Sequence, residues 1–351
     1  MKEETIKLFL EEGFQLSKEV LPLIEKNPEG ILSKLKKLKP RPIFITKEIL
    51  DGLVALPSPL EMKILKIFKS RSPPFSVSDY LDHFLMRFGK MKDMLFKKIG
   101  KEKVVSINKI SPKLNNFFLI GLVREIGKDF ILLEDPTGEI KLFFEKILQP
   151  ELTSIWLDDV IGVSCYRKNG KYFVRKVIFP DIPLDRKIVK TNEEKYLLIL
   201  TSPKKEKLKK IKEFIKTLHS PYFLVVFSSE KVLEELKPLF IDENTPPMLF
   251  QIDGLKVLVL NRNFYKNIKR TKSIQFLTAL LKRRHLYPFF SLNKSTKEDV
   301  FILNEIPDVV IANFEGSGHG NYKGTTIVVN DDPEKLFLVN LKTREVEEKI
   351  F

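Results

Sequence analysis

The sequence predicts a multidomain α+β protein with an N-terminal helical module, a five-stranded barrel and a C-terminal α/β domain. Apolar residues recur at helical spacing before residue 100, alternate at strand spacing from 104 to 182, and form alternating strand-length and helix-length segments beyond 190. With 351 residues and 43% hydrophobic content, the chain can bury more than one core. We expect the helical module at 1–70, a linker and docking helix at 71–103, the barrel at 104–184 and the α/β domain at 190–351.

The helical module is predicted from short amphipathic segments at 4–12, 16–25, 30–38 and 61–68. A basic link containing two prolines follows, and a longer helix is then expected at 77–99. Apolar residues at helical spacing predict that this longer helix docks on its own protein or on a partner. They are Tyr80, Phe84, Phe88, Met91 and Leu95.

The barrel is predicted from five short segments with strand periodicity. Gly121 lies in the first of them, where a residue without a side chain lets the strand bend enough to serve both halves of a barrel. Five strands with such a bend, and an interval before the fourth, are typical of an OB barrel. The expected strands are 117–123, 129–134, 139–144, 160–166 and 171–177.

The C-terminal region mixes strands and helices, which indicates an α/β layered domain. Asp253 and Gly254 form a tight turn that predicts a hairpin between two of the strands. Helices are expected at 204–218, 231–239 and 273–284. The expected strands are 196–200, 222–227, 249–252, 255–260, 300–303, 309–312, 325–329 and 336–341.

Charge and cysteine content narrow the class of protein. A formal charge of +15 and a pI near 9.5 favour a polyanionic partner, although a biased genome composition also produces lysine-rich chains. Cys165 is the single cysteine, so this chain alone forms neither a disulfide nor a thiolate zinc site. The apolar stretches are strand-length, and the first residues lack the apolar core of a signal peptide. We therefore expect an intracellular, nucleoid-associated protein.

Short motifs lie in a specific order along essentially the whole chain. They are EGFQLS at 12–17, LEDPTGEI at 133–140, VIFPDIP at 177–183, LLKRRHLYP at 280–288, LNEIPDV at 303–309 and GNYKG at 320–324. In this order they resemble the small subunit of archaeal family D DNA polymerase, in which an OB domain precedes a calcineurin-like phosphoesterase domain. The resemblance implies a calcineurin-like sandwich for the C-terminal region.

Active members of that family are 3′ to 5′ exonucleases. Their strand-end loops present Asp-x-His, Gly-Asp, Gly-Asn-His-Asp and Gly-His-x-His motifs to two metal ions, which activate water and stabilise the leaving oxygen. The resemblance implies a degenerate, shortened sandwich here, with no catalytic residue, no metal site and no cofactor. The corresponding segments are Thr201-Ser202-Pro203, Ser228-Ser229-Glu230, Asn261-Arg262 and Asn313-Phe314-Glu315.

The resemblance further implies a non-catalytic accessory subunit that binds the large catalytic subunit of a replicative DNA polymerase, with DNA as a second candidate partner. A protein interface needs apolar and aromatic side chains. The same side chains equally fit buried core positions. The candidates for partner binding are Tyr287, Phe289, Phe290, Tyr322 and Phe351, together with the tail at 336–351.

The main alternative is a stand-alone single-strand nucleic-acid-binding protein that uses the barrel face, where aromatic rings stack on bases beside cations. Strand residues alternate in direction, so only part of the candidate set faces a ligand. The aromatic candidates are Phe118, Phe130, Phe143, Tyr166 and Tyr172, and the cationic candidates beside them are Lys141, Arg167 and Lys171. The basic helices at 204–216 and 266–284 are candidates for contacts with duplex phosphates instead, and the second of them carries Lys282, Arg283 and Arg284.

A third hypothesis is residual metal-dependent 3′ to 5′ exonuclease activity with rearranged ligands. The candidate ligands are Asp299, Asp308, Glu315 and His319. Against it, each of the four histidines of the chain fits an ordinary structural or surface position, because no cluster of carboxylates and imidazoles surrounds it in the sequence.

Overall fold

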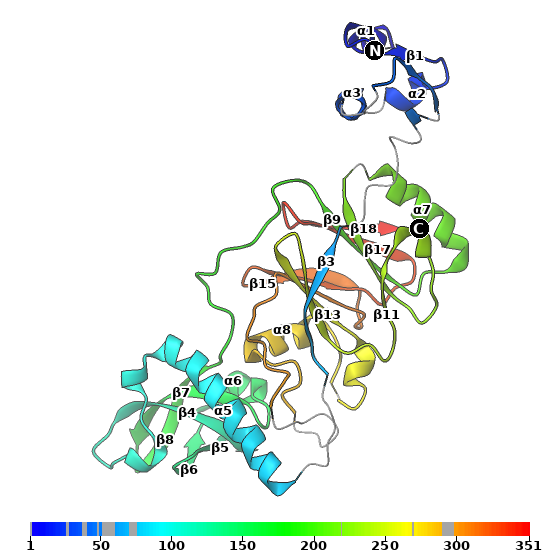
Figure 1. The fold of residues 1–351 in the computed structure, drawn as a ribbon. Coiled ribbons are helices and arrows are strands. Elements are labelled where there is room, and N and C mark those ends of the chain that lie inside the picture. The colour runs from blue at the N-terminus through cyan, green and yellow to red at the C-terminus, as the bar shows by residue number, and fades with distance from the viewer. Residues whose placement is uncertain are drawn as a thin grey trace.

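The computed structural model is a mixed α+β fold with several sheets and a few helices (Figure 1). It describes residues 2–25, 28–36, 41–47, 49–50, 60–69, 76–218, 220–268, 270–289 and 298–351. Within these ranges, no helix is both long and apolar enough to cross a membrane.

The N-terminal segment forms a small helical unit around its own core. Its elements are α1 (Lys2–Glu11), β1 (Gln15–Leu16), α2 (Leu21–Ile24), α3 (Pro28–Leu35) and β2 (Phe44–Ile45). Phe9, Phe14 and Ile24 are fully buried in that core, and β1 pairs with β2 in parallel. Helices at the first and third predicted positions are confirmed, whereas the predicted helix at 16–25 is mostly a strand and turn that ends in the single turn of α2.

The helix predicted at 61–68 is wrong. Strand β3 (Met62–Ile67) pairs antiparallel with β12 (Met248–Ile252), at the edge of a six-stranded sheet. The backbone N–H of Leu60 donates to the carbonyl of Tyr222, and that of Phe68 donates to the carbonyl of Pro247. Pairing with a strand about 185 positions away therefore overrides the weak local helical pattern.

Helix α5 (Val77–Ile99) confirms the predicted docking helix. A capping box between Ser76 and Asp79 begins it, and Gly100, with φ of 91°, ends it. From Phe84 to Leu95 its apolar stripe packs against the outside of the barrel, where Met91 and Leu95 meet Ile120. The side chain of Tyr80 lies outside the described part of the chain.

All five predicted barrel strands are present, as β4 (Asn116–Ile126), β5 (Phe130–Asp135), β6 (Gly138–Phe143), β7 (Val160–Lys168) and β8 (Lys171–Ile178). They close in the order β4-β5-β6-β8-β7, and α6 (Gln149–Ser154) lies between the third and fourth strands. A β-carbon on Gly121 would lie 2.4 Å from Cγ of Leu133 and 2.8 Å from the carbonyl oxygen of Glu134. Close approach of β5 is thus the reason that glycine is needed in β4.

The C-terminal region contains two further sheets. One has the order β11-β10-β9-β17-β18, and the other has the order β15-β16-β14-β13-β12-β3. The predicted hairpin is confirmed, because β12 pairs antiparallel with β13. The strands not yet given are β9 (Tyr196–Thr201), β10 (Tyr222–Phe227), β11 (Leu239–Ile241), β13 (Leu255–Leu260), β14 (Val309–Ala312), β15 (Gly318–Tyr322), β16 (Thr325–Val329), β17 (Lys335–Asn340) and β18 (Val346–Ile350).

The two sheets pack face to face, and one helix covers each outer face. Ile199 of β9 and Val259 of β13 belong to the core between the sheets. Their neighbours Leu200 and Leu260 point outward, toward α7 (Leu208–Thr217) and α8 (Ile274–Arg283) respectively. The alternation of apolar side chains therefore produces four layers, helix on sheet on sheet on helix (Figure 1).

Two predictions in this region are wrong. A helix was expected at 231–239, but Leu233 and Lys237 adopt left-handed backbone conformations, with φ of 61° and 50°, and only a short 3-10 turn (Glu234–Leu236) lies between them. The strand expected at 300–303 forms a single bridge, from Ile302 to His285. Strands β15 and β18 were missed, since both are rich in polar residues.

Candidate functional site

The carboxyl ends of the parallel strands form the first candidate site. Strands β9 and β10 run parallel in one sheet, and β13, β14 and β16 run parallel in the other. The two sets of ends are joined where Oγ1 of Thr201 donates to the carbonyl of Asn330 at 2.7 Å. The resemblance predicted that the metal-binding loops of the active family would correspond to these strand ends.

Two buried amides occupy this edge. Nδ2 of Asn330 donates to the carbonyls of Ile199 at 3.3 Å and Lys335 at 3.0 Å, so it connects β16 to two strands of the facing sheet. Asn261, which is 2% exposed, donates to the carbonyl of Asp242 and accepts from the backbone N–H of Asn263. Each amide satisfies backbone groups of its own protein, which leaves little capacity for a ligand.

The charged groups at the same edge also have internal partners. Arg262 forms an ion pair with Glu315 at 3.3 Å, and its backbone N–H donates to Oδ1 of Asn313 at 2.8 Å. The carboxylate of Asp331 accepts from the backbone of Gly316 and from both the backbone and the hydroxyl of Ser317. Among the residues described, no group of three or more His, Cys, Asp and Glu side chains is arranged to hold a metal ion.

The ligands of the residual-exonuclease hypothesis have separate partners. Asp299 lies in a buried cluster near α5, and Asp308 pairs with Arg186 and accepts from the backbone of Lys256. Glu315 pairs with Arg262, as described above, while His319 is exposed on the edge strand β15. The structure thus does not bring these four side chains together.

The outer face of the barrel is the second candidate site. Phe130, Phe143, Phe173 and Tyr166 form a row of half-buried rings, with successive centroids 6.3, 5.8 and 5.7 Å apart. Three cations lie over this row, at 3.7 Å for Lys141 over Phe130, 5.0 Å for Lys171 over Phe143 and 5.3 Å for Arg175 over Tyr166. Aromatic rings beside cations suit stacked bases and phosphates. We call these four rings the aromatic row.

The aromatic row differs from the predicted rings in three positions, and one predicted cation, Arg167, has an internal partner. Tyr172 points toward the barrel core and meets Phe117 edge to face at 5.5 Å. Phe118 faces α5, and Arg167 donates to the carbonyl of Pro112. Phe173 was missed, although the tight turn after Lys168 pairs Tyr166 with Phe173, and this pairing could have identified it.

The three predicted cations at the end of α8, Lys282, Arg283 and Arg284, make mainly internal contacts. Arg283 is 5% exposed, pairs with Asp159 at 2.8 Å and lies 3.5 Å above the ring of Trp156, so it joins α8 to the barrel. Arg284 is 6% exposed and donates to the carbonyls of Leu303 and Asn304. The expectation that these two arginines face a ligand is corrected by their burial. Lys282 is half-buried beside a cleft described below.

The aromatic residues predicted to bind a partner also have internal contacts. Tyr287 is 5% exposed, and Phe289 stacks on Trp156 at 5.1 Å. The hydroxyl of Tyr322 donates to Oδ1 of Asp181 at 3.0 Å. Phe351 meets Phe214 at 5.7 Å. Phe290 lies outside the described residues.

A buried charged cluster fixes α5 to the C-terminal region. Nε of Arg87 lies 2.6 Å from Oδ2 of Asp299, and a second nitrogen of Arg87 donates to the carbonyl of Pro288 at 2.8 Å. His285 Nε2 lies 2.8 Å from the same carboxylate oxygen, while its Nδ1 accepts from the backbone N–H of Tyr287. We call Arg87, Asp299, His285 and the neighbouring His83 the buried cluster.

Burial sets the protonation of the buried cluster. It lowers the pKa of His285 to about 4, although Asp299 opposes this effect. A neutral ring agrees with the geometry, because one nitrogen donates to Asp299 while the other accepts from Tyr287. Burial raises the pKa of the Asp299 carboxyl, but His285 and Arg87 outweigh it, and that pKa lies well below its usual range.

Comparison with known proteins gives partial similarity to one group. No family model matches the sequence. The chain is 25% identical over 169 residues to the DNA polymerase II small subunit of Archaeoglobus fulgidus, which covers 46% of this chain and 34% of that protein. It is 32% and 33% identical over 135 residues to the proteins of the same name from Pyrococcus furiosus and Pyrococcus abyssi. Those alignments cover 36% of this chain and 22% of each relative.

These relatives confirm the resemblance to the archaeal small subunits. The match spans about a third or less of the length of the curated relatives, and about 36–46% of this chain, not the essentially complete coverage that the motifs suggested. A solved structure of the S. pombe Stn1-Ten1 complex matches at 16% identity and a TM-score of 0.19, covering 32% of this chain and 87% of that one.

Proposed function

We propose that this protein is a non-catalytic accessory subunit of an archaeal replicative DNA polymerase, which binds the large catalytic subunit in the cytoplasm. The similarity to DNA polymerase II small subunits supports this proposal, because the name of those relatives gives them as one subunit of a polymerase. The closed barrel and the four-layered sandwich support an OB domain at 104–184 followed by a degenerate calcineurin-like domain at 190–351.

The contacts at the strand ends support the proposal that the protein is non-catalytic. Two-metal hydrolysis needs carboxylates and imidazoles that converge on a pair of cations. At this edge, the amides of Asn261 and Asn330 are bonded to backbone carbonyls, and Arg262 neutralises Glu315. A metal ion would have to break these bonds and meet a guanidinium group, so the edge acts as a structural joint.

An exonuclease assay tests this part. The full chain is incubated with 3′-labelled single-stranded DNA and Mn²⁺, and we expect neither nucleotide release nor heat of metal binding in calorimetry. Mn²⁺-dependent release that is lost in Glu315→Gln or His319→Gln would contradict the proposal. The exposed Glu243→Gln provides a control outside the strand-end bonds described above.

Co-purification tests the partner. The tagged chain is expressed in the cell from which it comes, and we expect a large DNA polymerase subunit to be recovered with it at near-equal amounts after a high-salt wash. Recovery of the tagged chain alone under these conditions would contradict the accessory-subunit assignment.

A second candidate function is single-strand nucleic-acid binding by the aromatic row. Stacking contributes about 1–3 kcal/mol per base, so Phe143→Ala and Phe173→Ala are each expected to weaken binding of an oligonucleotide about five-fold or more. Phe44→Ala is the control, because its side chain is 51% exposed in the N-terminal unit. Equal affinities for all three variants would remove the aromatic row from consideration.

A further inference from the structure

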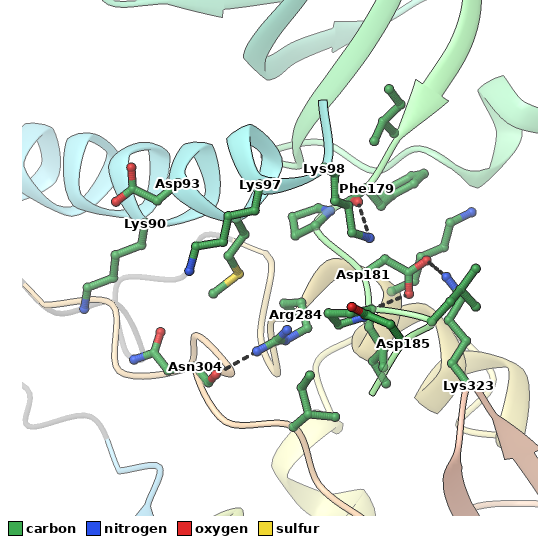
Figure 2. Close-up of a pocket in the computed structure, with 18 of the residues that line it drawn as sticks. Lys90, Asp93, Lys97, Lys98, Phe179, Asp181, Asp185, Arg284, Asn304 and Lys323 are labelled. Carbon is green, nitrogen blue, oxygen red and sulfur yellow. Dashed lines mark hydrogen bonds and ion pairs between the residues drawn. The ribbon is translucent and has the colours of Figure 1, made fainter. Parts of the chain in front are cut away.

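A cleft of about 1,120 Å³ lies between the C-terminal half of α5, the segment that leaves β8, and the adjoining sandwich (Figure 2). Figure 2 shows Lys90 and Lys97 extending from α5 toward the loop that carries Asn304, with Lys323 on the far side. The lysines that line it are Lys90, Lys97, Lys98, Lys176, Lys282 and Lys323, together with the buried and internally bonded Arg284, against three carboxylates, Asp93, Asp181 and Asp185.

The carboxylates leave much of this positive charge uncompensated. Asp181 is already used, since it pairs with Lys323 and accepts from the hydroxyl of Tyr322. Lys90, Lys97 and Lys176 form no ion pair with any carboxylate in the parts of the chain that the structure describes. The cleft therefore carries a net positive charge, and three of its rim lysines are unpaired with any described carboxylate.

Two further lysines are partly desolvated. The amine of Lys98 donates to the carbonyl of Phe179 at 3.2 Å (Figure 2). Burial lowers the pKa of Lys98 to about 8, with Lys323 and Arg284 acting in the same direction and Asp181 in the opposite one. Burial also lowers the pKa of Lys282. An anion in the cleft would favour the charged form of both amines.

The cleft continues along the barrel. A second hollow of about 590 Å³ shares Lys98 and Lys176 with it and extends to Lys103 and Arg175. Arg175 lies over Tyr166, at one end of the aromatic row. The cations thus follow a line from the sandwich to the barrel face, and a linear polyanion matches such a line better than a small anion does.

The floor of the cleft is apolar beneath this rim. Phe179, Pro180 and Ile182 line it from the segment after β8, and Ile306 lines it from the sandwich. A run of acidic residues alone, such as polyglutamate, would meet only the cations, whereas a nucleic-acid strand offers phosphates to the rim and bases to an apolar surface.

We propose that this cleft and its extension along β8 bind the sugar-phosphate backbone of a single nucleic-acid strand. The site goes beyond the accessory role, which requires only a protein partner. It meets the aromatic row at Arg175 alone, and none of the four rings of that row lines the cleft. Neither the polymerase partner nor the loss of metal ligands is needed for the inference.

Fluorescence anisotropy with labelled oligothymidylate of about 16 nucleotides tests the site. In the cleft variant, Lys90, Lys97 and Lys176 are all changed to Gln. The control variant carries the same change at Lys209, Lys210 and Lys216, which are exposed on α7, so the net charge is identical. Equal melting temperatures verify that both variants fold.

We expect the cleft variant to lose roughly ten-fold or more in affinity and its salt dependence to fall by about two in slope, because three phosphate contacts are removed. The control variant is expected to change affinity less than about two-fold. Equal losses in both variants would overturn the proposal in favour of general charge attraction, and no loss in either would overturn it as well.

Polyglutamate of similar length separates nucleic acid from acidic protein. We expect polyglutamate to bind the wild type weakly, and the cleft variant to lose no more affinity for it than the control variant does. A loss of polyglutamate binding as large as the loss of oligothymidylate binding would overturn the assignment to nucleic acid. Co-purification of the cleft variant with the large subunit keeps this result distinct from the accessory role.

Discussion

The two halves of α5 carry basic side chains in opposite electrostatic situations. In the first half, Arg87 is 3% exposed and meets the carboxylate of Asp299 and the carbonyl of Pro288. In the second half, Lys90 and Lys97 are exposed on the rim of the cleft, with no ion pair to a described carboxylate. One helix therefore combines a paired, buried joint with an unpaired, open surface.

The difference separates a structural role from a binding role. A cation whose partners lie inside the protein is costly to redirect, because any ligand must first replace those bonds. A cation without such partners gains from the arrival of an anion. The polar groups at the strand ends have internal partners, as Arg87 in the first half of α5 does. Lys90 and Lys97 in the second half, on the rim of the cleft, have no such partner among the described carboxylates.

Removing the carboxylate of the buried cluster is expected to have the largest effect. Asp299→Ala leaves the Arg87 charge buried without its carboxylate and should lower the free energy of unfolding by about 3–5 kcal/mol. Urea denaturation monitored by the fluorescence of Trp156, the single tryptophan, measures this change.

The matched control for that change is Glu315→Ala. This substitution breaks an ion pair with Arg262 in which both side chains are nearly half exposed. We therefore expect it to lower the free energy of unfolding by less than about 1 kcal/mol. Equal losses in the two variants would show that the buried cluster is not the stronger joint.

Acid should weaken the buried cluster before other regions. The pKa of His285 is about 4 in the folded protein and about 6.5 when unfolded, so the unfolded state binds the extra proton between these values. The contribution of neutral His285 to stability is fully present above pH 6.5. The free energy of unfolding should fall by roughly 3 kcal/mol as the pH drops to 4. Urea denaturation at a series of pH values measures the slope.

Two histidine variants check this assignment. His285→Gln keeps a donor toward Asp299 but cannot titrate, so its stability should change less over the same pH range. His319→Gln should retain the wild-type slope, since that side chain is exposed on β15. A wild-type slope in the His285 variant would contradict the role of the buried cluster.

Local sequence signals predicted the barrel and α5 well. Strand alternation and turn residues are encoded within a few positions, and all five barrel strands appear at the expected places. The stripe of apolar residues at helical spacing likewise identified the face of α5 that packs on the barrel.

Features decided by distant partners were not predictable in this way. Strand β3 depends on pairing with β12. Arg283 is buried against Asp159, which lies 124 positions earlier in the sequence. Asp299 was taken as a candidate ligand because nothing near it in sequence reveals Arg87, 212 positions earlier. The cleft was also missed, since its lysines come from separate segments of the chain.

The smallest expected change in stability concerns Lys98, which lines the cleft. Burial holds the folded pKa of Lys98 at about 8, below its ordinary value of 10.5, so below pH 8 the folded protein keeps a partly desolvated ammonium group. Lys98→Met removes that group, and we expect a gain at pH 7 of less than about 1 kcal/mol, because the side chain is partly exposed.

The difference in stability between the wild type and Lys98→Met is expected to change sign at higher pH, and this change can be measured. Between pH 8 and 10.5 the unfolded state holds a proton on Lys98 that the folded state has released, so wild-type stability rises relative to Lys98→Met across that window. Lys97→Met, on the exposed rim, should stay within about 0.5 kcal/mol of the wild type at every pH. If Lys98→Met were instead less stable at pH 7, the hydrogen bond to Phe179 would outweigh burial, and Lys98 would belong with the paired half of α5.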